Sequence, residues 1–137
     1  MRAKRKKIVV YGGAFDPPHT GHAAVIKSVM RFFPCDEIWM VPSSDREDKK
    51  IKTPGRDRLK MVRLMIQELF LNSKIPIKIL DLEVKRQEFT TTYETKHELE
   101  REYPNYYFWF LLGSDILGDI ERHWINGKKL WRETNFL

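Results

Sequence analysis

The hydrophobic and polar positions along this chain predict strands and helices in alternation. Short apolar runs that are rich in β-branched and aromatic residues are typical of buried strands. Apolar residues that recur every three or four positions are typical of a helix with one buried face. The apolar runs predict strands at 7–11, 36–44, 75–84 and 106–115. The periodic segments predict helices at 21–33, 55–71, 92–103 and near 117–132.

The same spacing predicts which helical faces are buried. In the first helix, which Pro34 ends, the predicted apolar face is Ala24, Val25, Val29 and Phe32 or Phe33. In the second helix it is Leu59, Val62, Met65, Ile66 and Leu69. Because strands alternate with helices, the sequence predicts an α/β fold: a doubly wound parallel sheet covered by helices on both faces.

Polar motifs follow three of the predicted strands. They are "GGAFDPPHTGH" at 12–22, "PSSDREDKK" at 42–50 and "GSD" at 113–115. Ligands of doubly wound sheets bind at the carboxyl ends of the strands, where the strand order reverses. We therefore expect these three motifs to line one binding site.

The first motif has the residues of a phosphate-binding loop. Gly12 and Gly13 allow the backbone to approach a ligand closely. Gly21 lies at the start of a helix, where free N–H groups and the helix dipole attract phosphate. His19 and His22 flank this helix mouth, and bound phosphates would favour their charged, donating form.

Asp16 has two candidate roles in this motif. Its carboxylate is able to hold a backbone turn, or to help position a Mg²⁺ ion beside the phosphates. Zinc is not predicted, because the two histidines lack a third and a fourth ligand and the spacing of zinc ligands on one helical turn.

Composition and charge exclude several classes of protein. The chain has 137 residues, one cysteine and a formal net charge of +6, which predicts one domain without an internal disulfide. No apolar run is long enough to span a membrane, and we expect a cytoplasmic protein. A nucleic-acid partner is not expected, because basic and aromatic residues are not interleaved along the sequence.

The first motif resembles the signature of the nucleotidyltransferase superfamily that carries H-x-G-H. In detail, "GGAFDPPHTGH" resembles that of the nicotinate-nucleotide (or nicotinamide-nucleotide) adenylyltransferase family. Further likenesses follow in order along nearly the whole chain: "VPSS" with "KK", "RLKM" at 58–61, "TTTYET" at 90–95 and "FLLGSDIL" at 110–117. Thr91 and Glu94 depart from the family pattern in the third of these.

The resemblance implies a Rossmann-like nucleotidyltransferase fold and an enzyme of NAD biosynthesis. Such an enzyme joins the AMP part of ATP to a pyridine mononucleotide, with Mg²⁺ as cofactor, and releases pyrophosphate. The implied catalytic residues are His19 and His22. The implied ATP-binding residues are Gly12, Gly13, Ala14, Phe15, His19, Gly21, His22, Gly113 and Asp115. Thr92 and Trp124 are implied for the pyridine substrate, and Lys49 and Lys50 are candidate phosphate contacts.

The end of the chain departs from the family. The family continues into a fifth strand and an S-T-x-x-R motif, whereas "RETNFL" ends this chain where that strand begins. We therefore expect a single nucleotidyltransferase domain over 1–137, shortened at its C-terminal end, with the fifth strand absent or short. Two alternatives stay open: a related enzyme that uses another acceptor or CTP, and a nucleotide-binding domain without catalysis.

Overall fold

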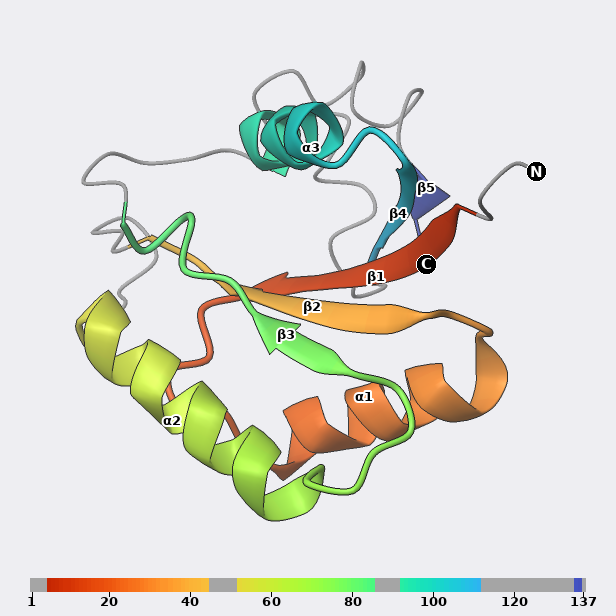
Figure 1. Cartoon of the computed structure of the whole chain (residues 1–137). Helices are drawn as coiled ribbons and strands as arrows, with labels where there is room; N and C mark the ends of the chain where they lie inside the picture. Colours follow the sequence, from red (N-terminus) through yellow and green to blue (C-terminus); the bar gives the residue numbers. More distant parts are fainter. Residues whose placement is uncertain (1–4, 45–51, 86–91, 112–134, 137) are drawn as a thin grey trace.

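The computed structural model describes residues 5–44, 52–85, 92–111 and 135–136 (Figure 1). The elements follow in the order β1 (Lys6–Gly13), α1 (Thr20–Phe32), β2 (Glu37–Pro42), α2 (Gly55–Leu69), β3 (Ile77–Ile79), α3 (Thr92–Glu102), β4 (Tyr106–Phe110) and β5 (Asn135–Phe136). The predicted elements up to β4 are confirmed; β1 is longer than the predicted 7–11, and β2, β3 and β4 are shorter than the apolar runs suggested. The helix predicted near 117–132 lies outside the described residues.

The strands form one sheet in the order β3-β2-β1-β4-β5, and every pair is parallel. After β1 the chain builds the sheet outward through β2 and β3, and it then returns to the other side of β1 with β4. Figure 1 shows α1 and α2 on one face of the sheet and α3 on the other. The doubly wound α/β fold is therefore confirmed, and the strand order reverses between β1 and β4.

The predicted fifth strand is present in short form. Asn135 pairs with Trp109 and Phe136 pairs with Phe110, so that β5 continues the parallel sheet beyond β4.

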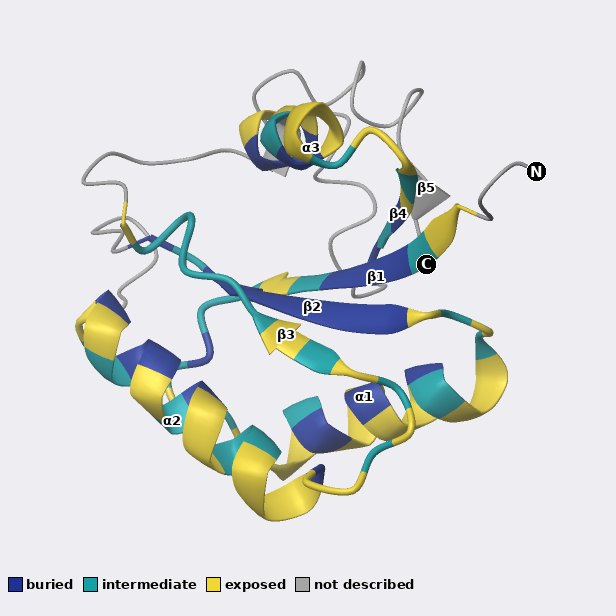
Figure 2. Ribbon diagram, in the orientation of Figure 1, coloured by how far each residue is buried: buried dark blue, intermediate teal, exposed yellow. Residues whose placement is uncertain are grey.

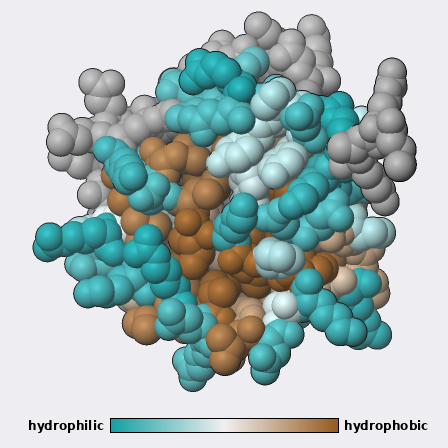
Figure 3. All heavy atoms as spheres, viewed as in Figure 1, coloured by the Kyte–Doolittle hydropathy of each residue, from teal (hydrophilic) through white to brown (hydrophobic). Residues whose placement is uncertain are grey.

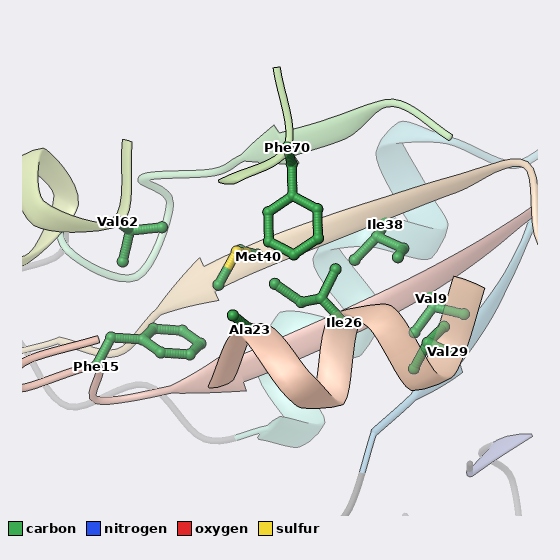
Figure 4. Packing of buried hydrophobic residues seen from close by; sticks show 9 residues of the cluster. All are labelled: Val9, Phe15, Ala23, Ile26, Val29, Ile38, Met40, Val62 and Phe70. Atoms are coloured by element: carbon green, nitrogen blue, oxygen red, sulfur yellow. The ribbon is translucent and has the colours of Figure 1, made fainter. Parts of the chain in front are cut away.

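Two apolar layers enclose the sheet, because side chains of a strand point alternately to its two faces. In β1, Val9 packs with residues of α1 and α2, whereas Ile8 and Val10 pack with Leu99 of α3. Figure 2 shows the buried middle of β1 and most of β2 between the helices on the two faces. The first layer, drawn in Figure 4, consists of Val9, Phe15, Ala23, Ile26, Val29, Ile38, Met40, Val62 and Phe70. The second consists of Ile8, Val10, Trp39, Val41, Leu99, Phe108 and Phe110.

The predicted buried face of α1 is confirmed at Val29 and in part at Phe33, and it was wrong at Ala24, Val25 and Phe32. Ala23, Ile26 and Val29 are buried, whereas Val25 is 37% and Phe32 is 74% exposed. The run "AAVIKSVMRFF" is apolar at so many positions that two helical phases fit it equally well. The docking of the helix start decides between them, and spacing within the helix does not contain that information.

The predicted face of α2 holds best near its start. Leu59 and Val62 are buried and Met65 and Ile66 pack against the core, whereas Leu69 is 45% exposed. Figure 3 shows hydrophobic side chains gathered on this side of the molecule, interrupted by hydrophilic ones. Among the described residues no helix is both long and apolar enough to cross a membrane.

A buried carboxylate joins the amino-terminal ends of three strands. Glu37 begins β2 and accepts a hydrogen bond from Trp39 Nε1 at 3.1 Å. It also lies 3.1 Å from Lys6 Nζ of β1 and 3.4 Å from Lys78 Nζ of β3. Burial alone would raise the pKa of Glu37, but the hydrogen bonds from Trp39 and Lys6 outweigh it and hold that pKa below its ordinary 4.5.

We predict that Glu37→Gln lowers the free energy of unfolding at pH 7 by about 1 kcal/mol, because both lost lysine partners are half-exposed. Glu37→Ala should cost about 2–3 kcal/mol, because it also leaves the buried Trp39 N–H without an acceptor. Urea unfolding measures both values. The folded pKa of Glu37 is the lower one, so its contribution is complete above about pH 4.5 and is lost as the pH falls through the folded pKa.

The difference between wild type and Glu37→Gln should therefore shrink as the pH is lowered below 4.5. Glu68→Gln, on the exposed face of α2, is the matched control and should leave stability almost unchanged. A Glu37→Gln difference that stays constant into acid would contradict the assigned ion pairs.

Candidate functional site

The loop between β1 and α1 lies where the fold predicts a ligand site. It follows the carboxyl end of β1, next to the point where the strand order reverses between β1 and β4. The segment after β2 meets it directly, because the Ser43 N–H donates to the Gly13 carbonyl at 2.8 Å. The motifs after the first two strands are thus brought together as expected.

His19 and His22 cap the start of α1 reciprocally. Nδ1 of His19 accepts the N–H of Gly21 at 3.0 Å, and Nδ1 of His22 accepts the N–H of His19 at 3.0 Å. The two rings stack with their centroids 3.9 Å apart and their planes inclined by 23°. Both imidazoles therefore lie side by side at the helix mouth, where the sequence predicts them.

The capping decides which ring atoms are available to a ligand. A ring nitrogen that accepts an N–H cannot itself carry a hydrogen, so the neutral ring has its hydrogen on Nε2. Nε2–H is then the free donor of His19 and of His22. Burial, and after it the neighbouring His19 ring, lowers the pKa of His22 below its ordinary 6.5. The free protein thus presents His22 as a neutral donor at neutral pH.

The absence of a side chain at Gly21 makes room for the His19 ring. A Cβ at this position would lie 2.8 Å from Cε1 and 2.9 Å from Nδ1 of His19, closer than real contacts allow. The N–H of Gly21 is donated to the same ring. The N–H that was expected near phosphate thus serves the helix cap in the free protein, and the ATP-binding role of Gly21 stays a prediction.

Phe15 packs its ring against the His22 ring of the stacked histidine pair. Its ring is buried and makes edge contacts with His22 at 4.9 Å and with Tyr11 at 5.3 Å between centroids. Its φ of 50° is in the left-handed region, which costs a non-glycine residue about 1–3 kcal/mol and persists only where the surroundings impose it. Phe15 was predicted for backbone contacts with ATP; the structure adds a packing role for its side chain.

Asp16 holds a neighbouring segment. Its Oδ2 accepts the N–H of Lys52 at 2.9 Å and that of Thr53 at 3.2 Å. Hydrogen bonds from the Thr53 side chain and from the Lys52 N–H keep the pKa of Asp16 below its ordinary 3.8. Of its two candidate roles, the geometry displays the structural one. In the described ranges, no three His, Cys, Asp or Glu side chains come together as a metal-binding group.

Arg58 is the site residue that sequence reasoning did not assign. It is fully buried in α2; its Nε donates to the Thr53 carbonyl at 2.9 Å and its Nη1 to the Ala14 carbonyl at 2.8 Å. The only signal in the sequence was its place in "RLKM", next to an apolar face. From sequence alone, an arginine beside the apolar face of a helix is expected to be exposed to solvent. Its burial becomes evident only when the loop that it contacts is known.

The remaining predicted residues divide into two groups. Gly12 ends β1 beside Gly13, and a Cβ there would meet the Val41 carbonyl at an ordinary 3.8 Å. Thr92 begins α3. Outside the described residues lie Lys49, Lys50, Gly113, Asp115 and Trp124.

A doubly wound α/β sheet with paired imidazole donors at the first helix mouth defines a nucleotide-binding protein. A family model described as cytidylyltransferase-like matches residues 10–136. The chain therefore belongs to the cytidylyltransferase-like family.

Two individual relatives show a more specific similarity than the family model. The chain is 36% identical over 112 residues to an Oceanobacillus iheyensis protein that bears the name probable nicotinate-nucleotide adenylyltransferase; the match covers 82% of this chain and 56% of that protein. It is 31% identical to a Bacillus cytotoxicus protein of the same name, over 96% of this chain and 68% of that protein. The chain thus spans a little over half to two thirds of these relatives.

A solved structure shares the fold closely. It is the Plasmodium falciparum nicotinic acid mononucleotide adenylyltransferase complexed with NaAD, with a TM-score of 0.81 and 34% identity. The match covers 96% of this chain and 63% of that one.

We predict that Gly21→Ala displaces the His19 ring, because the new Cβ would overlap it. In ¹⁵N-labelled wild-type protein, NMR should show both capping rings with hydrogen on Nε2. In Gly21→Ala the His19 signals should move to a mixture of tautomers. The usual gain of about 1 kcal/mol from glycine to alanine in a helix should be lost as well, because the cap is lost with it.

Gly12→Ala is the matched control, because its Cβ meets no atom closer than 3.8 Å. His19 signals that stay unchanged in Gly21→Ala would show that the ring does not depend on this glycine.

Proposed function

We propose that this chain acts as a nicotinate-nucleotide adenylyltransferase, transferring the AMP part of ATP to nicotinate mononucleotide with release of pyrophosphate. The observation that carries the proposal is the stacked, reciprocally capped histidine pair with both Nε2 donors left available at the mouth of α1. The named relatives and the Plasmodium structure complexed with NaAD support this acceptor. With ATP as co-substrate, we expect the reaction to take place in the cytoplasm.

The reaction asks mainly for positioning and charge stabilisation. A phosphate oxygen of the mononucleotide attacks the α-phosphorus of ATP, and the bond from that phosphorus to the β-phosphate oxygen breaks as pyrophosphate leaves. The attacking phosphate is already anionic at neutral pH, so no general base is required. Catalysis then rests on holding two anions together and on donors aimed at the charge that develops during transfer.

His22 is the proposed main contact of the α-phosphate that is transferred as part of AMP. His19 is the proposed anchor of the triphosphate. Both donate through Nε2, since Nδ1 of each ring is held by the helix cap. Bound phosphates raise the pKa of a nearby imidazole, so ligand binding works against the lowered pKa of free His22. His22 therefore changes from a neutral towards a charged donor as substrate arrives.

Mg²⁺ fits this site as part of the MgATP substrate rather than as a resident ion. The described residues assemble no group of three ligands, and Oδ2 of Asp16 already accepts two N–H groups. The triphosphate itself is then the main ligand of the ion. Of the remaining assignments, Gly113 and Asp115 would bind adenosine, and Lys49 and Lys50 the phosphates. Thr92 and Trp124 would contact the pyridine nucleotide.

A second candidate is the same transfer from CTP, which the cytidylyltransferase-like family description favours. Pyrophosphate release measured with ATP or CTP, and with nicotinate or nicotinamide mononucleotide, separates the two. Turnover with ATP and nicotinate mononucleotide supports the proposal, whereas turnover with CTP alone removes it. Calorimetric binding of ATP with no product at high protein concentration would indicate a binding domain without catalysis.

We predict that His22→Ala lowers turnover by roughly a hundredfold or more, the usual loss for one preorganised donor. His97→Ala, on the exposed face of α3, is the control and should retain wild-type turnover. Both variants are compared by steady-state pyrophosphate release. Wild-type turnover in His22→Ala would reject the role proposed for this ring.

We predict that Asp16→Asn and Asp16→Ala differ strongly in turnover. The asparagine keeps an oxygen that can accept the Lys52 and Thr53 N–H groups, so its turnover should stay within about threefold of wild type. The alanine removes that acceptor and should lose roughly tenfold to a hundredfold, the scale of small misplacements in an active site. Equal losses in both variants would instead assign the function to the charge of Asp16, as contact with the metal requires.

A further inference from the structure

Arg58 is a fully buried cation at the base of the candidate site. Burying a guanidinium is unfavourable unless its N–H groups find acceptors. Nε and Nη1 of Arg58 meet this requirement with the carbonyls of Thr53 and Ala14, at 2.9 and 2.8 Å. Two of the donor groups of this buried side chain are thus directed at backbone carbonyls of the site.

The two carbonyls belong to different segments. Ala14 lies in the loop after β1, and Thr53 precedes α2. Asp16 joins the same two segments a second time, because its carboxylate accepts the N–H groups of Lys52 and Thr53. Arg58 and Asp16 therefore make four hydrogen bonds that form a closed ring. This ring holds the loop between β1 and α1 against the start of α2.

The surroundings are shaped to admit this side chain. A Cβ at Gly55, the first residue of α2, would lie 3.3 Å from Nη2 of Arg58 and 2.6 Å from Val84. The absence of a side chain at Gly55 thus makes room at the helix start for the guanidinium and for Val84.

The position held by Arg58 bears directly on the histidines. Ala14 precedes Phe15, whose backbone is in the left-handed region and whose ring lies 4.9 Å from that of His22. A shift of the Ala14 carbonyl would move the Phe15 ring and, through it, the stacked pair. The strained backbone of Phe15 needs a fixed neighbour, and the hydrogen bond from Arg58 to Ala14 supplies one.

We propose that Arg58 is a positioning residue for nucleotidyl transfer: its buried guanidinium fixes the Ala14 carbonyl and so aligns His19 and His22 with the reacting phosphates. This role rests on the proposed function. It depends on the planar fork of arginine, which donates in two fixed directions, whereas the single ammonium of lysine cannot reproduce that geometry.

The test compares Arg58→Lys with Arg56→Lys. Arg56 lies on the same helix with its side chain 87% exposed, so the control makes the same chemical change outside the site. Arg58→Lys should lower kcat at least tenfold with KM for ATP changed less than threefold, because the donors remain and their alignment is lost. Arg56→Lys should match wild type in both constants.

A second readout needs no turnover. In ¹⁵N-labelled protein without substrate, Arg58→Lys should shift the ring-nitrogen signals of His19 and His22, whereas Arg56→Lys should leave them in place. A loss of kcat with unshifted rings, or shifted rings with wild-type kcat, would overturn the positioning role. Where wild type itself shows no turnover, the proposed function fails. Unshifted ring signals in Arg58→Lys would then still overturn the positioning role of Arg58.

Folding of Arg58→Lys is checked by thermal unfolding. Where this variant does not fold, Asp16→Ala replaces it, because Asp16 is only half-buried and opens the same ring of hydrogen bonds from its outer side. The same pair of changes is then expected: lower kcat and shifted histidine signals. Wild-type values for both in Asp16→Ala would overturn the proposal.

Discussion

The candidate site depends on one constraint: the first turn of α1 must satisfy its N–H groups, and the histidine rings do so. Each ring uses Nδ1 for a backbone N–H, which leaves Nε2 as its free nitrogen. The need of every helix start for capping groups thus becomes the device that orients two donors. Stacking of the rings follows from the same bonds, and the absence of a side chain at Gly21 makes it sterically possible.

Around this pair, the fold supplies support from three sides. Phe15 packs under His22, Asp16 ties the loop to the segment before α2, and Arg58 anchors the loop from within. None of these contacts requires a ligand. The histidine pair is therefore already oriented in the free protein, and the proposed nucleotidyl transfer would use it without reorganisation as charge develops.

The prediction from sequence succeeded where the pattern was local and strongly marked. The alternation of strands with helices, the parallel sheet and the position of His19 and His22 at a helix mouth followed from spacing and residue type. The buried face of α1 did not, because its run of apolar residues admits two phases and only docking on the sheet selects Ala23 and Ile26. The packing role of Gly21 also could not be predicted from spacing, because it depends on where the His19 ring lies in the cap.

The sequence by itself determined the α/β class, the elements as far as β4 and the chemical character of the first loop, since each is encoded in residues close together along the chain. Only the tertiary structure decided which distant groups Asp16 and Arg58 contact, because Lys52 and Thr53 are 36 and 37 residues from Asp16 and Ala14 is 44 residues from Arg58. A carboxylate or a guanidinium has the same chemistry on the surface and in the interior. Which role it takes depends on the backbone groups that folding brings within hydrogen-bond distance.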